Sequence, residues 1–242
     1  KLPKYLEDDL KDAHSHRREG WHKWVRDNKQ WKIFMQGYLA SISYVDYQLG
    51  RLLDGLDSSP LKGNTIIILW SDHGFHIGEK QNWEKFALWD QTTRVPFFVH
   101  APGVSVDGVI TRQPVTLTDI YPTLCELADL PVPKLCNGNS LVPQLKNPNA
   151  IKDEPALTAF QFWKEDKPSL AIADSRYRFI RYGDGFEELY DLETDPNEFQ
   201  NLISDPGLVK VKMRLVNSLP RKVMPMQKIP QNSPFHRGRK RK

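Results

Sequence analysis

Apolar residues recur at three- and four-residue steps over one long stretch in the N-terminal part of the chain. The stretch begins at Trp31, continues to Leu56 and stops at the helix-breaking residues 57–60. This spacing is typical of an amphipathic helix, here of about seven turns. Gly37 and Gly50 each cost such a helix about 1 kcal/mol relative to alanine, so we expect close packing against them.

Two short runs of β-branched and apolar residues follow, at positions 65–70 and 95–100. Continuous apolar runs of this length are typical of strands that are buried on both faces of a parallel sheet. Residues 118–128 then predict a capped helix, in which Pro122 is tolerated in the first turn. The order helix, strand, strand, helix predicts an α/β layer structure.

After about Asn149 the pattern changes to short runs that are typical of antiparallel strands. They lie at residues 169–173, 177–182 and 187–192, with a hairpin turn at 183–185 between the last two. A weak helical period follows over residues 206–219. The predicted divisions are an α/β part over 1–149, an antiparallel α+β subdomain over 150–225 and an irregular basic tail over 226–242.

Composition and charge exclude some of the possible classes of protein. Of the 242 residues 39% are hydrophobic, and the longest apolar run is only 66–70. This content supports a core, and the run is far shorter than the roughly 20 residues of a membrane span. The net charge is +4, but five positive charges lie in the last six residues. We therefore expect no nucleic-acid partner, and the tail is a solvated terminus, a polyanion contact or a sorting signal.

The two cysteines, Cys125 and Cys136, are too few for a disulfide scaffold and lack the spacing of a zinc site. They could pair or stay free, so they do not decide the redox compartment.

The segment with the clearest chemistry is Ser71-Asp72-His73-Gly74, directly after the first predicted strand. In open α/β sheets ligands bind beyond the carboxyl ends of strands. Asp72 and His73 can offer an oxygen and a nitrogen to one metal ion there, and Gly74 permits a sharp turn. The alternative is that Asp72 caps a turn and His73 hydrogen-bonds to it.

A polar and aromatic loop over residues 75–86 follows, and it holds His76, Lys80 and Lys85. A cation close to a metal ion indicates an anionic ligand between them, because the two positive centres would otherwise repel. Phosphate and sulfate esters are the obvious candidates. The alternative for a single lysine, and the favoured one for Lys80, is a solvated surface charge.

These residues resemble the type I sulfatases of the alkaline phosphatase superfamily, and the iduronate-2-sulfatase-like branch most closely. The motif is 71–79 followed by Trp83-Glu84-Lys85. Further similar stretches, in the family's order, are 38–53, 119–124, 138–141, 188–192 and 195–198. The resemblance implies part of an alkaline-phosphatase-like sandwich, a mostly parallel sheet flanked by helices, followed by the smaller antiparallel subdomain.

The resemblance also implies roles for three residues. Asp72 and His73 would be two ligands of one calcium ion, which would polarise the sulfate and the nucleophile together. Lys85 would be catalytic and substrate-binding: it would contact the sulfate and the bridging oxygen, stabilising negative charge as the ester bond breaks. His76 and Lys80 receive no assigned role.

The family's nucleophile is absent from the chain. Sulfatases use a formylglycine made in a Cys/Ser-x-Pro/Ala-x-Arg motif, and neither Cys125 nor Cys136 begins one. The N-terminal Asp pair of the metal site is also missing, and Asp8-Asp9, which follows no strand, is interpreted as a solvated loop. We therefore expect the C-terminal half of a sulfatase, inactive alone, whose calcium site is completed by residues of an N-terminal half.

The expected substrate is a sulfated small molecule or glycan, and the resemblance implies a periplasmic, extracellular or lysosomal location. The aromatic stretch 14–31 would suit a saccharide or would pack as a surface loop. Two alternatives stay open. One is a phosphatase, phosphonate hydrolase or phosphodiesterase of the same superfamily, although after His76 only His100 and His236 remain as further histidine ligands. The other is a non-catalytic partner or relic.

Overall fold

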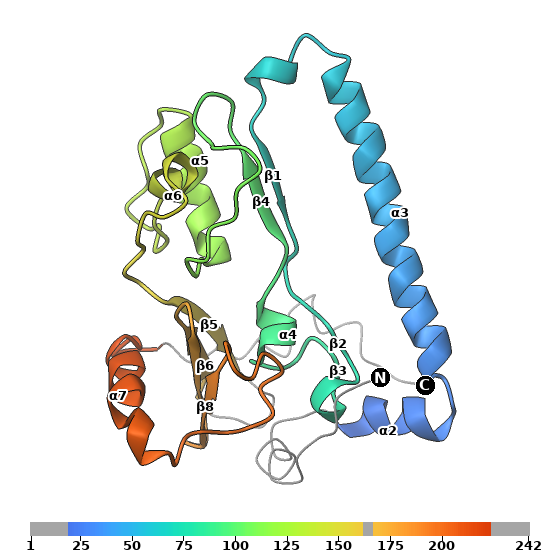
Figure 1. Ribbon diagram of the computed structural model, residues 1–242, viewed down its shortest axis with the longest axis vertical. Coiled ribbons are helices and arrows are strands. Elements are labelled where there is room, and N and C mark those ends of the chain that lie inside the picture. The colour runs from blue at the N-terminus through green and yellow to red at the C-terminus, as the bar shows by residue number, and fades with distance from the viewer. Residues whose placement is uncertain (1–18, 162–166, 224–242) are drawn as a thin grey trace, which may run out of the picture.

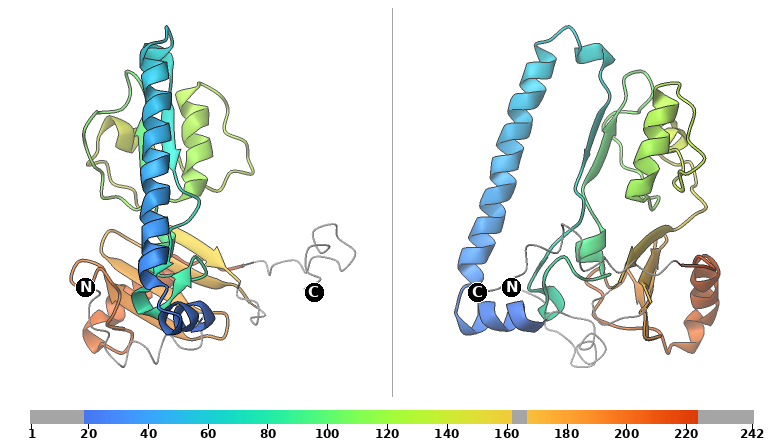
Figure 2. Two further views of the ribbon diagram at one scale, coloured as in Figure 1. Left: turned by 90° about the vertical axis from the view of Figure 1, so that its right-hand side faces the viewer. Right: turned by 180° about the vertical axis from the view of Figure 1, so that it is seen from behind.

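The computed structural model describes residues 19–161 and 167–223. Asp8-Asp9 and the tail 226–242 lie outside these ranges. Helix α2 (Glu19–Asp27) leads into the long helix α3 (Trp31–Asp57), whose bounds agree with the predicted helix. Figures 1 and 2 show α3 as a single rod that stands to one side of the molecule. The sequence did not predict α2, because its polar, tryptophan-rich stretch is too short to display a clear period.

No side chain of α3 is buried by the described residues. A Cβ atom added at Gly37 or Gly50 would have no described atom within 4 Å. The expectation of close packing at these glycines is therefore not met within the described part of the chain.

Strands β1 (Ile67–Trp70) and β4 (Phe97–His100) form a two-stranded antiparallel ribbon. Ile67 lies opposite His100 and Trp70 lies opposite Phe97. The prediction of parallel strands is wrong for this pair, since the segment between them folds back and brings the start of β4 beside the end of β1. A parallel pair would need a crossover connection along the ribbon. Burial on both faces is also incomplete: Trp70 is 49% exposed and Phe98 is 63% exposed.

The connection between β1 and β4 contains a small hairpin and a short helix. Strand β2 (His76–Ile77) pairs with β3 (Trp83–Glu84) around the 3-10 turn η2 (Glu79–Gln81). Helix α4 (Asp90–Thr93) follows. Figure 1 shows α4 where the ribbon meets the C-terminal sheet.

The predicted helix at 118–128 is confirmed as η3 (Leu117–Asp119) continued by α5 (Ile120–Leu127), with α6 (Val142–Lys146) nearby. Thr116 and Asp119 form a capping box, which satisfies backbone donors at the start of the helix. Cys125 and Cys136 are both free thiols in this structure and form no disulfide with each other.

The C-terminal sheet has four antiparallel strands in the order β5-β6-β7-β8. Their bounds are Ala156–Phe160, Ser169–Ala173, Tyr177–Arg181 and Glu187–Asp191. One face packs on Leu88 and Trp89, and the other on α7 (Val209–Asn217), which follows η4 (Pro206–Leu208). The three predicted strands, the turn and the helix are confirmed, whereas β5 was not predicted.

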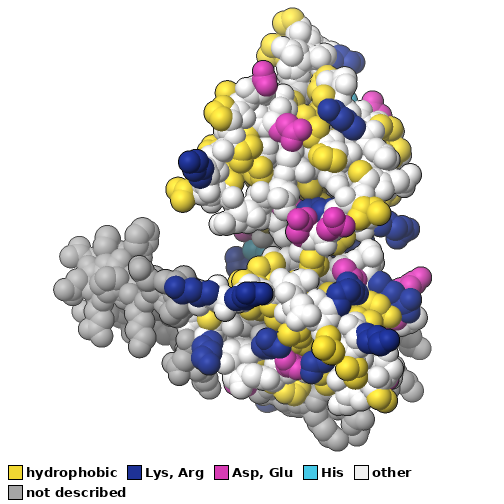
Figure 3. All heavy atoms as spheres, turned by 90° about the vertical axis from the view of Figure 1, so that its left-hand side faces the viewer, with side chains coloured by type: hydrophobic (Ala, Val, Ile, Leu, Met, Phe, Trp, Pro, Cys, Tyr) yellow, Lys and Arg dark blue, Asp and Glu magenta, His cyan; other side chains and the backbone are white. Residues whose placement is uncertain are grey.

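Figure 3 shows Lys and Arg side chains gathered over the lower part of one face, where α7 lies. Two of the basic residues of α7 are ion-paired: Lys212 with Glu187 at 2.6 Å and Arg214 with Asp174 at 2.5 Å. The positive charge of this face is thus partly neutralised by neighbouring carboxylates. Among the described residues, no helix has the length and apolar character needed to cross a bilayer.

Candidate active site

The three predicted site residues lie together where β1 and β3 end. Asp72 and His73 follow β1, and Lys85 is the residue after β3. The Lys85 Nζ atom lies 2.9 Å from Nε2 of His73. The same Nε2 atom lies 3.6 Å from the Oδ2 atom of Asp72, whose side chain is 80% exposed. The fold therefore brings a carboxylate, an imidazole and an ammonium to one solvent-accessible point.

The hydrogen bonds of His73 indicate which ring nitrogen carries the proton. Its Nδ1 atom lies 2.7 Å from the backbone oxygen of Gly74, and a carbonyl oxygen only accepts. Nδ1 is therefore the donor, and the lone pair of Nε2 faces the Lys85 ammonium group. The distance of 3.6 Å to Asp72 is too long for a hydrogen bond, so the alternative in which His73 simply bonds to Asp72 does not describe this site.

The implied calcium ion can be tested against the donors that are present. Asp72 offers a hard carboxylate oxygen, which suits calcium, and His73 offers one nitrogen. Calcium takes six to eight ligands, and the described residues contain no group of three or more His, Cys, Asp or Glu side chains able to hold a metal ion. Asp72 and His73 thus fit as a part of such a site and do not form one alone.

Gly74 fixes the turn between His73 and the rest of the loop. Its N–H donates to the carbonyl oxygen of Thr92 in α4 at 2.9 Å. A Cβ atom at this position would lie 2.1 Å from the backbone oxygen of Gln91. No residue other than glycine fits, because the loop backbone lies directly against α4.

The β2–β3 hairpin, which carries Lys85, packs against the N-terminal end of α3. The Trp83 ring lies 5.6 Å from that of Trp31 and 5.7 Å from that of Phe34, edge-on in both cases. A Cβ atom at Gly78 would lie 2.2 Å from the Trp31 ring. These contacts make residues near the C-terminal end of the stretch 14–31 part of a packed aromatic cluster.

Lys80 is buried, and its interpretation as a solvated charge is wrong. The residue is 1% exposed, and its Nζ atom donates to the backbone oxygen of Glu198 and to the Tyr190 hydroxyl, the latter at 3.3 Å. It also lies 4.7 Å from the centre of the Trp89 ring, a cation–π distance. The sequence could not reveal this, because both hydrogen-bond acceptors, the Tyr190 hydroxyl and the Glu198 carbonyl, lie more than a hundred residues away in the sequence.

His76 is also buried, with 1% exposure, and its ring packs edge-on against Trp89 at 5.7 Å. Burial lowers the pKa of His76, although Glu79, 3.8 Å away, opposes this effect. The imidazole is therefore held neutral inside the protein.

Three charged residues behind the site were not predicted: Asp90, Arg178 and Glu198. The Arg178 Nη2 atom lies 2.5 Å from Oδ1 of Asp90, and its Nε atom lies 2.9 Å from Oε1 of Glu198. Burial raises the pKa of Glu198 to about 7, against the lowering effect of Arg178 and Lys80. The available signal was a charged residue, Arg178, inside the apolar run of a strand.

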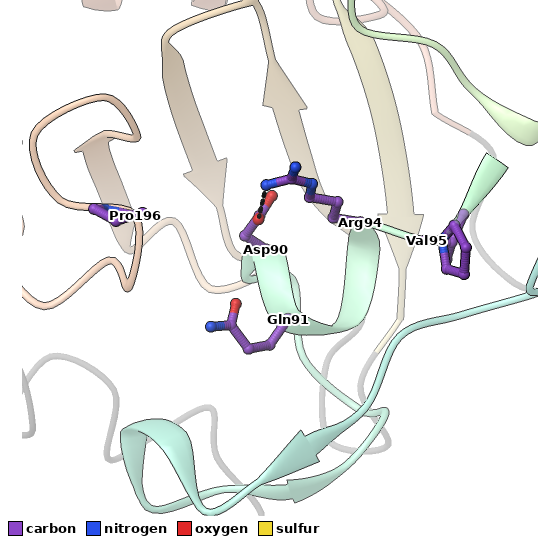
Figure 4. A pocket seen from close by; sticks show the side chains of 6 residues that line it. Asp90, Gln91, Arg94, Val95 and Pro196 are labelled. Atoms are coloured by element: carbon purple, nitrogen blue, oxygen red, sulfur yellow. Dashed lines mark ion pairs between the residues drawn. The ribbon is translucent and has the colours of Figure 1, made fainter. Parts of the chain in front are cut away.

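A shallow cleft of about 460 Å³ lies beside α4. Its lining residues are Asp90, Gln91, Arg94, Val95, Pro96 and Pro196. Figure 4 shows the side chains of Asp90 and Arg94 turned toward each other, with Arg94 Nη1 at 3.7 Å from Oδ2 of Asp90. The Arg94 side chain is 80% exposed, so it is open to solvent at the rim of this cleft.

Comparison with known proteins identifies the fold class and the family of the chain. Residues 10–130 match the sulfatase family, and residues 78–224 match the C-terminal region of N-sulphoglucosamine sulphohydrolase. The class is that of α/β domains of the alkaline phosphatase type, as the predicted fold class stated. The chain belongs to the sulfatase family, which confirms the resemblance drawn from its motifs.

Two relatives illustrate the similarity. A sulfatase of Formosa agariphila is 42% identical over 179 residues, which are 74% of this chain and 34% of that protein. Iduronate 2-sulfatase of Mus musculus is 30% identical, over 70% of this chain and 44% of that protein. The chain thus spans about a third to a little under a half of the length of these relatives.

Two solved structures are also similar to this chain in fold. A protein whose structure was solved in complex with its substrate D-glucosamine-2-N,6-O-disulfate superposes with a TM-score of 0.68 and 26% identity, over 77% of this chain and 40% of that one. The phosphonate monoester hydrolase of Agrobacterium radiobacter superposes with a TM-score of 0.64 and 28% identity, over 73% and 38% respectively.

Proposed function

We propose that this chain is part of a sulfatase that hydrolyses sulfate esters of a carbohydrate or another small molecule. The observation that carries the proposal is the contact of 2.9 Å between Lys85 and His73 next to the exposed carboxylate of Asp72. A cation and two metal-ligating groups at one accessible point suit a tetrahedral oxyanion such as sulfate.

Each residue has a role in this proposal. Lys85 presents its ammonium group to the sulfate and to the bridging oxygen, where negative charge grows as the ester S–O bond breaks. Asp72 would hold calcium through a carboxylate oxygen, and His73 would hold it through Nε2 once the Lys85 ammonium group, now at 2.9 Å from that atom, has turned to the sulfate. The ion, when bound, would polarise the sulfate and the nucleophile together. The hydrogen bond from Nδ1 to Gly74 keeps the ring turned so that Nε2 points toward the site.

The nucleophile and the remaining calcium ligands come from residues that this sequence does not contain. No Cys/Ser-x-Pro/Ala-x-Arg motif is present in its 242 residues. We therefore expect no turnover of aryl sulfates by the chain on its own. We also expect activity from a complete enzyme, in which the chain is combined with a part that carries the formylglycine. Hydrolysis by the purified chain alone would contradict this division of the site.

A calcium titration of the complete enzyme tests the metal role. Asp72→Ala should weaken calcium binding and abolish sulfate release, since water does not replace the lost negative charge. Asp107→Ala is a matched control, because Asp107 is likewise 79% exposed and pairs with a histidine, His100, at 3.1 Å. Normal calcium content and normal rate in Asp72→Ala would overturn the metal assignment.

A second candidate function is the hydrolysis of phosphonate monoesters, which the similarity to the Agrobacterium radiobacter enzyme favours. Both esters carry one negative charge at neutral pH, and they differ in that the sulfate has three non-bridging oxygens where the phosphonate has two and a carbon substituent. Sulfate and phosphonate esters with the same nitrophenol leaving group, tested on the complete enzyme, would separate them. A larger kcat/KM for the sulfate ester supports the proposal, and a larger value for the phosphonate ester overturns it.

A further inference from the structure

Five charged side chains are gathered behind the candidate site, and we call them the charge cluster. Two of them, Lys80 and Asp90, belong to the loop between β1 and β4. The other three, Arg178, Glu188 and Glu198, belong to the C-terminal sheet and the loop after it. Four of the five are at most 5% exposed. Burying such charges costs several kcal/mol for each ion, which an apolar junction between the same elements would avoid.

Arg178 holds α4 by its side chain. Its Nη2 atom donates to Oδ1 of Asp90 at 2.5 Å, and its Nη1 atom donates to Oγ1 of Thr93 at 2.8 Å. Glu198 adds a contact at the start of the helix, where its Oε2 atom accepts the N–H of Asp90 at 2.6 Å. Arg178 and Glu198 are themselves 2.9 Å apart. Both ends of α4 are thus fixed to the C-terminal subdomain.

Helix α4 in turn holds the loop that carries His73. The Thr92 carbonyl oxygen accepts the N–H of Gly74, and the Gly74 carbonyl oxygen accepts Nδ1–H of His73. The contact between Gly74 and Gln91 leaves no space for the loop to move toward α4. A displacement of α4 would therefore turn the His73 ring and change the distance from Nε2 to Lys85.

We propose that Arg178 and Glu198 are positioning residues, which set the orientation of His73 against Lys85 through α4 and Gly74. The argument rests on geometry: a planar guanidinium with several fixed acceptors determines direction as well as distance. An apolar contact would hold α4 in place without fixing its rotation. The proposal builds on the proposed function, because it assigns these residues to the same site.

The first experiment needs no turnover. In the 242-residue chain, the ring signals of His73 are followed by NMR and assigned with a His73→Gln variant. Arg178→Lys and Glu198→Gln should both shift these signals and leave those of His100 in place. Arg176→Lys is the matched control, since the Arg176 guanidinium group pairs with Asp191 and Glu193, neither of which belongs to α4. Unshifted His73 signals in both folded variants would overturn the proposal.

The second experiment measures the complete enzyme. Arg178→Lys should lower kcat on the order of 10- to 100-fold, as expected for a small misplacement of a reacting group, while KM changes less than about twofold. A role confined to stability would lower the melting temperature and leave kcat of the folded enzyme unchanged, which would also overturn the proposal. If the unaltered complete enzyme fails to release sulfate while the His73 signals still shift, the proposed function fails and the positioning role stands.

Discussion

The long helix α3 and the C-terminal sheet are opposites in burial, although both are rich in apolar residues. Leu39, Ile42 and Leu52 of α3 are 55%, 51% and 69% exposed. Phe179 and Leu189 of the sheet are 0% and 1% exposed. An amphipathic helix whose apolar face is open needs a further surface to cover it. The sheet, in contrast, is covered on both faces by segments of this chain, so the two regions differ in what they require from elsewhere.

The strongest test of this difference in burial is a pair of substitutions that shorten one side chain in each region. Phe179→Ala should lower the free energy of unfolding of the chain by about 3–5 kcal/mol, because it leaves a cavity in a closed core. Leu52→Ala should change it by less than about 0.5 kcal/mol, since that side chain is exposed. Denaturant unfolding followed by fluorescence and circular dichroism measures both. Equal losses of unfolding free energy would mean that α3 is covered in solution, and would contradict the difference in burial between α3 and the sheet.

The next test separates chemistry from stability. In the complete enzyme Lys85→Ala should lower the rate of the chemical step on the order of 10²–10³-fold, because an ammonium beside the bridging oxygen helps the transition state most. The loss should be smaller for a nitrophenyl sulfate than for the sulfate of a sugar alcohol. Equal losses for both leaving groups, with only KM altered, would make Lys85 a binding residue.

Lys80 lies five residues from Lys85 and should respond in the opposite way. Lys80→Met keeps much of the volume and removes the ammonium, so it should cost the folded chain about 2–3 kcal/mol through the lost cation–π and hydrogen-bond contacts. Lys85→Met, the matched control at an exposed position, should leave the free energy of unfolding unchanged. If both variants unfold alike, the burial of Lys80 is contradicted.

The smallest expected effect is a dependence on pH. The pKa of His76 is lowered by burial, so below its usual value of about 6.5 the unfolded chain binds a proton that the folded chain does not. The stability that neutral His76 contributes is therefore lost as the pH falls from about 6.5 toward its lowered pKa, by at most about 1.4 kcal/mol per pH unit, whereas the raised pKa of Glu198 acts with the opposite sign. His76→Leu should remove this slope, and an unchanged slope between pH 6.5 and 5 would contradict it.

The sequence predicted the features that depend on residues close together along the chain, and it missed those that depend on distant residues. Helix α3 and strands β6 to β8 follow from local periodicity, which neighbouring residues determine. The proximity of Asp72, His73 and Lys85 could be predicted because a motif keeps them close in sequence, and their roles stay a prediction. The antiparallel pairing of β1 with β4 was not predictable, because strand orientation is decided by the intervening fold. Nor was the burial of Lys80, which depends on contacts with the distant loop at Glu198.

The order of the C-terminal strands has a consequence for how the chain folds. Each of β5, β6, β7 and β8 pairs with the strand that follows it in the sequence, so the contacts of this sheet are local and little loop entropy is lost in making them. We expect the sheet to form early. The contacts of Arg178 with α4 span 85 and 88 residues, and they can close only after both partners exist. The charge cluster would then be assembled last, as the slow step of folding.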